Sequence, residues 1–222
     1  MTAALPILRL DGVSKSYASA GDAVAVLANA HLAIEPGEKV SLMGPSGSGK
    51  STLLSLIAGL LRPDSGAVEL DGVSLAGLDD GQRAKLRSER IGIARQSENL
   101  IPFLTALENV ELALGFGGGG KDSGRAKELL ERMQVAHRAD RFPRHLSGGE
   151  AQRVALAVAV ANDPAILLAD EMVSALDSAT AARVVDDLFA GEMAVLFATH
   201  DFALADRADR WLCLRDQKVV PR

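Results

Sequence analysis

Short apolar segments separated by turn residues fill the first third of the chain. They lie at residues 8–10, 23–27 and 31–34, and glycine, aspartate or proline stands between them. Segments of this length with such boundaries are typical of β-strands. A further compact apolar run, residues 40–43, leads directly into a glycine-rich loop. The pattern therefore predicts a β-rich start to the chain.

The spacing of the apolar residues changes after this loop. Between residues 51 and 61 the apolar positions recur at helical spacing, which predicts a helix with one buried face. Its apolar residues are Leu53, Leu54, Leu56, Ile57, Leu60 and Leu61. The turn residues at 62–66 are expected to stop this helix. Two more short strands are predicted at residues 67–70 and 91–94.

The middle of the chain has a helical character. Residues 105–114, 124–134 and 149–160 suit helices, and four consecutive glycines at 117–120 indicate a flexible surface link. Beyond them, residues 165–169 and 194–198 are apolar runs of the kind that form buried parallel strands. The sequence thus predicts an α/β nucleotide-binding core with a helical insertion.

Composition limits the class of protein. The 222 residues suffice for one large domain, with or without an inserted lobe, and 48% of them are apolar, as in globular chains. The formal net charge of −5 argues against nonspecific nucleic-acid binding, which depends on cationic contacts. A single cysteine suits a reducing compartment. We see no signal peptide and no apolar run of spanning length, so a membrane role is expected to come through a partner.

A glycine-rich loop between the predicted strand and helix carries the first chemistry. It consists of Gly44, Pro45, Ser46, Gly47, Ser48, Gly49, Lys50, Ser51 and Thr52, and fits G-x-x-x-x-G-K-[ST]. Glycines let backbone N–H groups approach phosphates, and the following helix presents its positive dipole end to them. Lys50 is predicted to reach the β- and γ-phosphates, and Ser51 to coordinate magnesium. The alternative is a glycine-rich turn that binds nothing.

Two acids end the strand predicted at residues 165–169. Asp170 suits the magnesium-holding acid of such a nucleotide site, and Glu171 suits a general base for the attacking water. The alternative is an acid pair at a helix N-terminus, where Asp and Glu are favoured.

A second glycine-containing segment comprises Leu146, Ser147, Gly148, Gly149 and Glu150. Alone it would suit an ordinary helix N-cap. Combined with the phosphate loop and the acidic strand, it resembles the signature motif LSGGE of the ABC ATPase family. The resemblance covers nearly the whole chain. It implies two domains paired head to tail, in which each signature closes on the ATP held by the other copy's phosphate loop.

The resemblance assigns further roles. Tyr17 matches the aromatic that stacks on adenine, Gln96 the glutamine that senses magnesium and the γ-phosphate, and His200 the switch histidine. Residues 174–177 match the loop that crosses to the partner. Tyr17 could instead be a plain surface aromatic, and His200 a core histidine. The implied fold is a P-loop NTPase core, at about residues 1–96 and 162–222, with an N-terminal antiparallel β subdomain and an inserted helical subdomain at about 97–161.

Residues 99–110 and 176–180 look like the lipoprotein-releasing, macrolide-exporter and cell-division branch of the family. The chain departs from the family pattern at Met172–Val173, where Pro-Thr is usual, at Val158, where arginine is common, and at Arg95, where an aromatic is usual. None of these changes removes a phosphate, metal or base group.

The expected protein is therefore an ATPase that uses ATP and Mg²⁺ and pairs with a second copy of itself. Integral membrane permease subunits are expected to dock near Gln96 and residues 97–110, at the cytoplasmic face of the inner membrane, with no nucleic acid involved. The expected work is export or extraction of a lipoprotein, lipid or drug-like substrate. The alternatives are a regulatory motor in cell-wall or division control, an ABC ATPase acting on DNA or the ribosome, and a small-molecule P-loop kinase.

Overall fold

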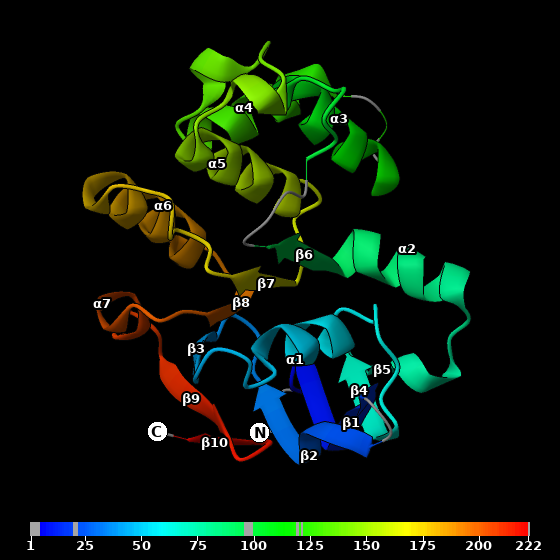
Figure 1. Cartoon of the computed structure of the whole chain (residues 1–222). Coiled ribbons are helices and arrows are strands. Elements are labelled where there is room, and N and C mark those ends of the chain that lie inside the picture. Colours follow the sequence, from blue (N-terminus) through cyan, green and yellow to red (C-terminus); the bar gives the residue numbers. More distant parts are fainter. Residues whose placement is uncertain (1–4, 20–21, 96–99, 119, 121, 222) are drawn as a thin grey trace. The chain divides into compact units, whose positions relative to one another are not determined.

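The computed structural model describes residues 5–19, 22–95, 100–118, 120 and 122–221 (Figure 1). The chain forms two compact units. The first comprises Met1–Ala84 and Ala194–Arg222, and the second comprises Lys85–Met193. α2 (Asp80–Arg90) contributes residues to both units.

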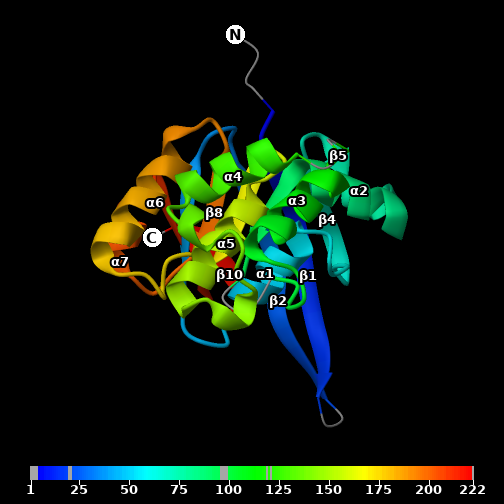
Figure 2. The ribbon, with the colours of Figure 1, turned by 90° about the horizontal axis from the view of Figure 1, so that it is seen from above.

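The first unit contains an antiparallel sheet with the strand order β2-β1-β4-β5. Its strands are β1 (Leu8–Ser19), β2 (Asp22–Ile34), β4 (Ser65–Leu70) and β5 (Val73–Ser74). β1 and β2 run side by side as a long ribbon, which Figure 2 shows. The antiparallel β subdomain implied by the resemblance is thus confirmed.

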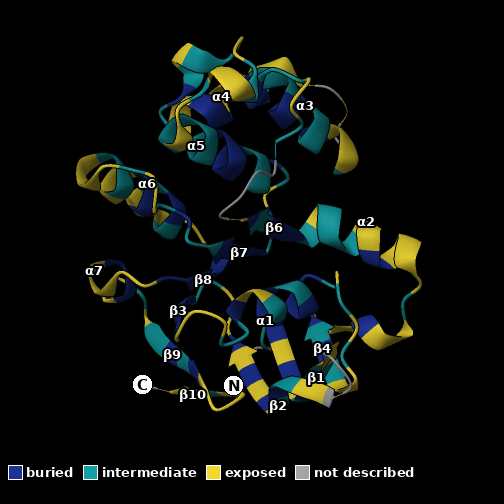
Figure 3. Ribbon diagram, in the orientation of Figure 1, coloured by how far each residue is buried: buried dark blue, intermediate teal, exposed yellow. Residues whose placement is uncertain are grey.

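The first two strands are longer than the apolar segments predicted. Gly12 and Asn29, where the pattern breaks, have φ of 63° and 51° and lie beside register shifts of the β1–β2 ladder. Such bulges absorb an interruption without ending the strand. The predicted segments at residues 23–27 and 31–34 are therefore parts of one strand, β2. At residues 8–11 of β1 and 30–34 of β2 buried and exposed residues alternate, as expected for strand segments that cover a core with one face (Figure 3).

Four further strands of the first unit have the order β10-β9-β3-β8. They are β3 (Lys39–Met43), β8 (Ala194–Ala198), β9 (Arg210–Arg215) and β10 (Lys218–Pro221). β3 is parallel to both β8 and β9, whereas β10 returns antiparallel to β9. All residues of β3 and β8 are buried, as in parallel strands covered on both faces. The prediction of a buried parallel strand at residues 194–198 is confirmed.

The helix after the glycine-rich loop, α1 (Lys50–Ile57), is shorter than predicted. Gly59 has φ of 65°, and the N–H groups of Leu60 and Leu61 both bond to the Ser55 carbonyl, at 2.9 and 3.2 Å. A left-handed glycine at this point ends the helix before the predicted turn at residues 62–66. Leu60 is consequently 47% exposed rather than part of the buried face.

The second unit pairs β6 (Ile91–Ala94) in parallel with β7 (Ile166–Asp170). Its helices include α3 (Ala106–Phe116), α4 (Ser123–Arg132), α5 (Gly148–Ala159) and α6 (Ser178–Ala190). The first three lie where the periodicity predicts helices. At Gly92 a Cβ atom would lie 2.4 Å from the Ala159 carbonyl oxygen, so β6 and the end of α5 pack closely only because glycine stands there.

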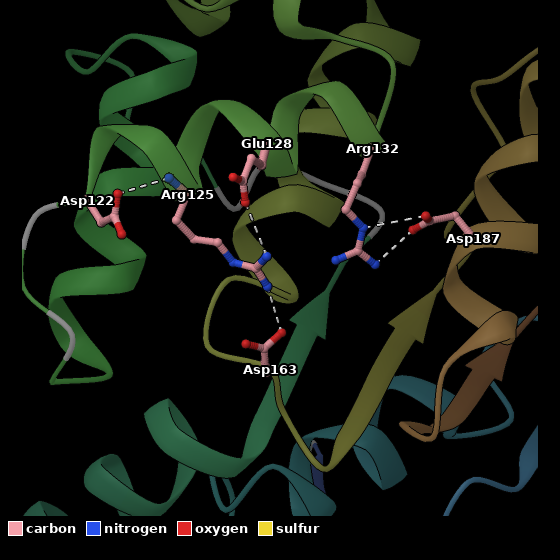
Figure 4. A network of polar contacts seen from close by, with 6 residues as sticks. All are labelled: Asp122, Arg125, Glu128, Arg132, Asp163 and Asp187. Atoms are coloured by element: carbon pink, nitrogen blue, oxygen red, sulfur yellow. Dashed lines mark hydrogen bonds and ion pairs between the residues drawn. The ribbon is translucent and has the colours of Figure 1, made fainter.

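Ion pairs surround α4 within the second unit (Figure 4). Arg125 contacts Asp163 at 2.9 Å, and Arg132 donates to both carboxylate oxygens of Asp187 on α6, at 3.0 and 3.4 Å. Surface pairs of this kind contribute at most about 1 kcal/mol each. The unit is held mainly by its apolar core, in which Leu129, Leu130 and Leu156 are fully buried.

Candidate nucleotide site

The phosphate loop joins β3 to α1 in the first unit. Gly47 and Gly49 have φ of 75° and 103°, in a region that L-residues rarely adopt. A Cβ on Gly49 would also lie 2.4 Å from Val26 Cγ1. The glycines therefore hold a backbone conformation that other residues would strain.

Lys50 folds its ammonium back over this loop. Its Nζ donates to the carbonyls of Gly44 and Pro45, at 2.8 and 3.0 Å, and its side chain is buried. The first turn of α1 contains no acidic residue. Its N–H groups and positive dipole end are thus available to an anion rather than to an acid of the chain itself. The buried Ser48 hydroxyl has no hydrogen-bond partner in the described part of the chain. These features fit a bound phosphate chain.

Tyr17 lies beside this loop. Its hydroxyl is 3.5 Å from Thr52 Oγ1, and its side chain is 41% exposed. A half-exposed ring next to a phosphate loop offers a face on which a planar base could stack.

His200 lies at the same edge of the sheet as the start of the phosphate loop. β8 and β3 are parallel, with Ala198 opposite Leu42, and the Thr199 N–H donates to the Leu42 carbonyl at 3.3 Å. Since Gly44 follows β3 and His200 follows β8, both emerge at the carboxyl end of adjacent strands. His200 is exposed, so it is not a packed core histidine.

The acid pair lies in the second unit, where Asp170 ends β7 and Glu171 follows it. Glu171 has φ of 55°, which costs a residue with a side chain on the order of 1–3 kcal/mol. The next helix, α6, begins at Ser178 and is capped by Asp177, so the pair does not cap a helix.

β6 ends at Ala94, opposite Ala169. Gln96, expected after this strand, lies outside the described residues.

Ser147 is the N-cap of α5. Its Oγ accepts from the Glu150 N–H, and the Glu150 carboxylate accepts from the Ser147 N–H at 2.8 Å. Arg138 Nε also donates to Glu150 at 2.7 Å. Together the backbone bond from Ser147 and the bond from Arg138 lower the pKa of Glu150 to about 2. Ser147 and Gly148 are exposed, so the helix start can contact another molecule.

Sequence reasoning missed two residues of this region, Arg138 and Gln152. Gln152 Nε2 donates to the Glu171 carbonyl at 2.7 Å, and its Oε1 accepts from the Ala175 N–H at 3.0 Å. A glutamine two residues after the signature carries no local pattern that would reveal this contact. Only the folded chain brings α5 against the loop after β7.

A family model described as ABC transporter matches residues 27–174. The chain belongs to the ABC transporter family. It is 43% identical to the lipoprotein-releasing system ATP-binding protein LolD of Hyphomonas neptunium, with 97% of each chain covered. It is 44% identical to the corresponding LolD 1 of Rhodospirillum rubrum, with 96% of this chain and 97% of that protein covered.

A solved structure is also similar over nearly its whole length. It is the dimeric, post-hydrolysis state of the cassette MJ0796 of Methanocaldococcus jannaschii, bound to ADP and Pi. The TM-score is 0.91 at 42% identity, with 96% of each chain covered. The chain is therefore an ATP-binding ABC ATPase with the ABC ATPase fold, as predicted. No helix in the described ranges is both long and apolar enough to cross a membrane.

Proposed function

We propose that the chain drives a membrane complex of the lipoprotein-releasing type, which extracts or exports a lipoprotein, lipid or drug-like substrate through separate membrane subunits. The observation that carries this proposal is the similarity to two lipoprotein-releasing ATP-binding proteins over nearly the full length of each. The whole of residues 1–222 is proposed to act as a single nucleotide-binding domain, with a helical subdomain at about 97–161.

The residue roles in ATP binding follow the motifs. Gly44, Gly47, Gly49 and the start of α1 bind the phosphates with backbone N–H groups, and Lys50 adds a compact positive charge. Tyr17 stacks on the adenine. The oxygen donors of Ser51 and Asp170, together with Gln96, suit Mg²⁺, which supplies charge neutralisation to the phosphates when bound.

Hydrolysis is assigned to three residues. Glu171 acts as the general base for the attacking water, and His200 and Gln96 contact the γ-phosphate region. The backbone of Glu171 is held at its carbonyl by Gln152 and by the Ser174 hydroxyl, at 2.7 and 3.1 Å. These bonds fix the main chain from which the side chain of the base extends.

A second copy of the chain completes each site. The related cassette MJ0796 is dimeric in a state that holds ADP and Pi. In the proposed pair, Ser147, Gly148, Gly149 and Glu150 of one copy bind the ATP held by the phosphate loop of the other. The exposure of the start of α5 supports this assignment.

Membrane subunits are proposed to dock near residues 96–110, which would place the chain at the cytoplasmic face of the inner membrane. Phe103 lies in this segment and is 75% exposed. A large apolar side chain so placed suits an anchor for a helix of a partner.

Isolation of the tagged chain from detergent-solubilised membranes tests the docking. An integral membrane subunit should accompany the wild type, and Phe103→Asp should abolish this association. Phe116→Asp is the matched control, since Phe116 is 68% exposed on the same unit but lies outside the proposed segment. Equal retention of the subunit by both variants would contradict the docking site.

Reconstitution of that complex in liposomes bearing a triacylated lipoprotein tests the work performed. ATP-dependent release of the lipoprotein to an acceptor supports the proposed function. ATP hydrolysis that is stimulated by the membrane subunit without any release would favour a regulatory motor instead.

A further inference from the structure

The side chain of Gln152 is engaged at both of its polar atoms by one loop. Its Nε2 donates to the Glu171 carbonyl at 2.7 Å, and its Oε1 accepts from the Ala175 N–H at 3.0 Å. An amide that donates and accepts at once fixes both the spacing and the direction of the two backbone groups. Gln152 thus spans the loop between Glu171 and Ala175.

The residue held at one end of this bridge has an uncommon backbone conformation. Glu171 lies in the left-handed region, with φ of 55°. Its carbonyl accepts from the Gln152 side chain, from the Ser174 hydroxyl at 3.1 Å and from the Ser174 N–H at 3.2 Å. The surrounding groups must hold such a conformation, because the isolated backbone does not favour it. Gln152 is the donor that comes from another element of the fold.

The other end of the bridge lies against the signature. A Cβ on Gly149 would be 2.8 Å from the Ala175 carbonyl oxygen and 3.1 Å from Leu176 Cδ2. The start of α5 therefore packs directly on the loop that Gln152 spans. Gln152 lies on α5 five residues after the N-cap Ser147, so the helix start and the loop are joined by packing and by hydrogen bonds.

We propose that Gln152 is a positioning residue that ties the backbone of Glu171 to the signature helix. This inference rests on the proposed function, in which Glu171 serves the ATP of its own chain and Ser147 contacts the ATP of the partner. A movement of α5 on binding the partner's ATP is transmitted through Gln152 to the carbonyl of Glu171. Gln152 therefore couples the two sites and sets the rate of hydrolysis without touching ATP.

The test is Gln152→Met, which keeps the length of the side chain and removes both hydrogen bonds. Loss of the bridge should lower kcat about 10-fold, in line with one or two net hydrogen bonds. KM, the Kd for ATP and the thermal midpoint should stay within about twofold or a few degrees of the wild type. The Hill coefficient for ATP should fall toward one, since the two sites lose their link.

Gln152→Glu is the second variant. It keeps an acceptor for the Ala175 N–H but places a carboxylate oxygen against the Glu171 carbonyl, so its kcat should fall at least as far. Gln134→Met is the matched control, because Gln134 of the same unit contacts the Arg183 side chain rather than the loop. Its kcat and Hill coefficient should equal those of the wild type.

Wild-type kcat and Hill coefficient in both Gln152 variants would overturn the inference. So would a fall in kcat matched by an equal loss of ATP affinity or of stability, which is what a purely structural role predicts. Glu171→Gln, measured in parallel, separates this failure from failure of the proposed function. Full turnover by Glu171→Gln would show that Glu171 is not the base, and the proposed function of that residue would fail. An inactive Glu171→Gln together with Gln152 variants of wild-type activity would refute only the coupling through Gln152.

Discussion

The two glycine-rich segments of the chain use glycine for different physical reasons. In the phosphate loop, Gly44, Gly47 and Gly49 all have positive φ, so the segment needs glycine for its backbone conformation even at Gly47, where a Cβ would meet no atom within 4 Å. Gly44 and Gly49 also lack space for a Cβ, which would lie 2.7 Å from the Leu214 carbonyl oxygen and 2.4 Å from Val26 Cγ1. In the signature, Gly148 and Gly149 have ordinary helical backbone as the first residues of α5. Gly149 is needed for space, because a Cβ would lie 2.8 Å from the Ala175 carbonyl oxygen.

The phosphate loop and the loop after β7 differ in which side chains hold them. The lysine of the phosphate loop bonds to carbonyls of the same loop, from Gly44 and Pro45. The loop after β7 is instead held from α5, through Gln152. Lys50 thus holds the loop that carries it, whereas the loop after β7 is held by a side chain of another element. Substitution of Lys50 should therefore act within its own loop, and substitution of Gln152 should act on a different element.

The largest effect is expected from Lys50→Ala. Removing the ammonium from the phosphate loop takes away charge-assisted bonds to the phosphates, which should weaken ATP binding by about 100-fold or more. Isothermal titration with ATP measures this loss. The exposed Lys127→Ala on α4 serves as the control and should bind like the wild type. Unchanged affinity in Lys50→Ala would refute the phosphate assignment.

Glu171→Gln should separate binding from turnover. The amide keeps the shape of the side chain but cannot accept a proton, so kcat should fall about 100-fold or more while the Kd for ATP stays the same. The variant should accumulate as an ATP-bound dimer in size-exclusion chromatography. Glu192→Gln is the control at an exposed glutamate. Full turnover by Glu171→Gln would end its role as base.

Gly148 and Gly149 test whether the signature needs glycine because a Cβ atom has no room. Gly149→Ala should lower the free energy of unfolding by about 1–3 kcal/mol, because its methyl group meets the Ala175 carbonyl. At Gly148 the nearest atom to a new Cβ is 3.9 Å away, so Gly148→Ala should be neutral or stabilise by up to about 1 kcal/mol. Urea denaturation of both variants measures the difference. Equal stabilities would show that packing at Gly149 does not decide its identity.

Gly47 tests whether the phosphate loop needs glycine because of its positive φ. A Cβ at this position meets no atom within 4 Å, so the cost of Gly47→Ala should come from φ alone, at about 1–2 kcal/mol. Gly47→Asn should cost less, because asparagine tolerates the left-handed region. The same denaturation assay compares them. An asparagine variant no more stable than the alanine variant would contradict this explanation.

The smallest effect concerns Glu150 and pH. Its pKa in the folded chain is lowered from 4.5 to about 2, so its contribution to stability is fully present above pH 4.5 and is lost as the pH falls toward 2. Glu150→Gln should therefore lose less stability than the wild type between pH 6 and pH 3. Identical pH profiles for Glu150→Gln and wild type would show that Arg138 and Ser147 do not hold the carboxylate.

Much of the fold could be predicted from the sequence where an element carries its own pattern. α3, α4, α5, β3 and β8 lie close to the predicted ranges because apolar periodicity marked them. α2, α6 and β9 were not predicted. Arg83 is the buried residue of α2, so this helix shows no apolar stripe. The interruption at Gly12 predicts the end of a strand, whereas the ladder absorbs it as a bulge.

The sequence by itself determined the chemistry of this chain: a phosphate loop, an acid pair after a strand, and a signature segment at a helix start. Each is a short run whose function depends on residue types at fixed spacing, so it can be recognised without a fold. Only the tertiary structure decided how the loop after Glu171 is held. The contact of Gln152 with Glu171 joins residues 19 positions apart, and it exists because α5 packs on the loop after β7. Hydrogen bonds between elements leave no local pattern, since their spacing is set by the packing of the whole chain.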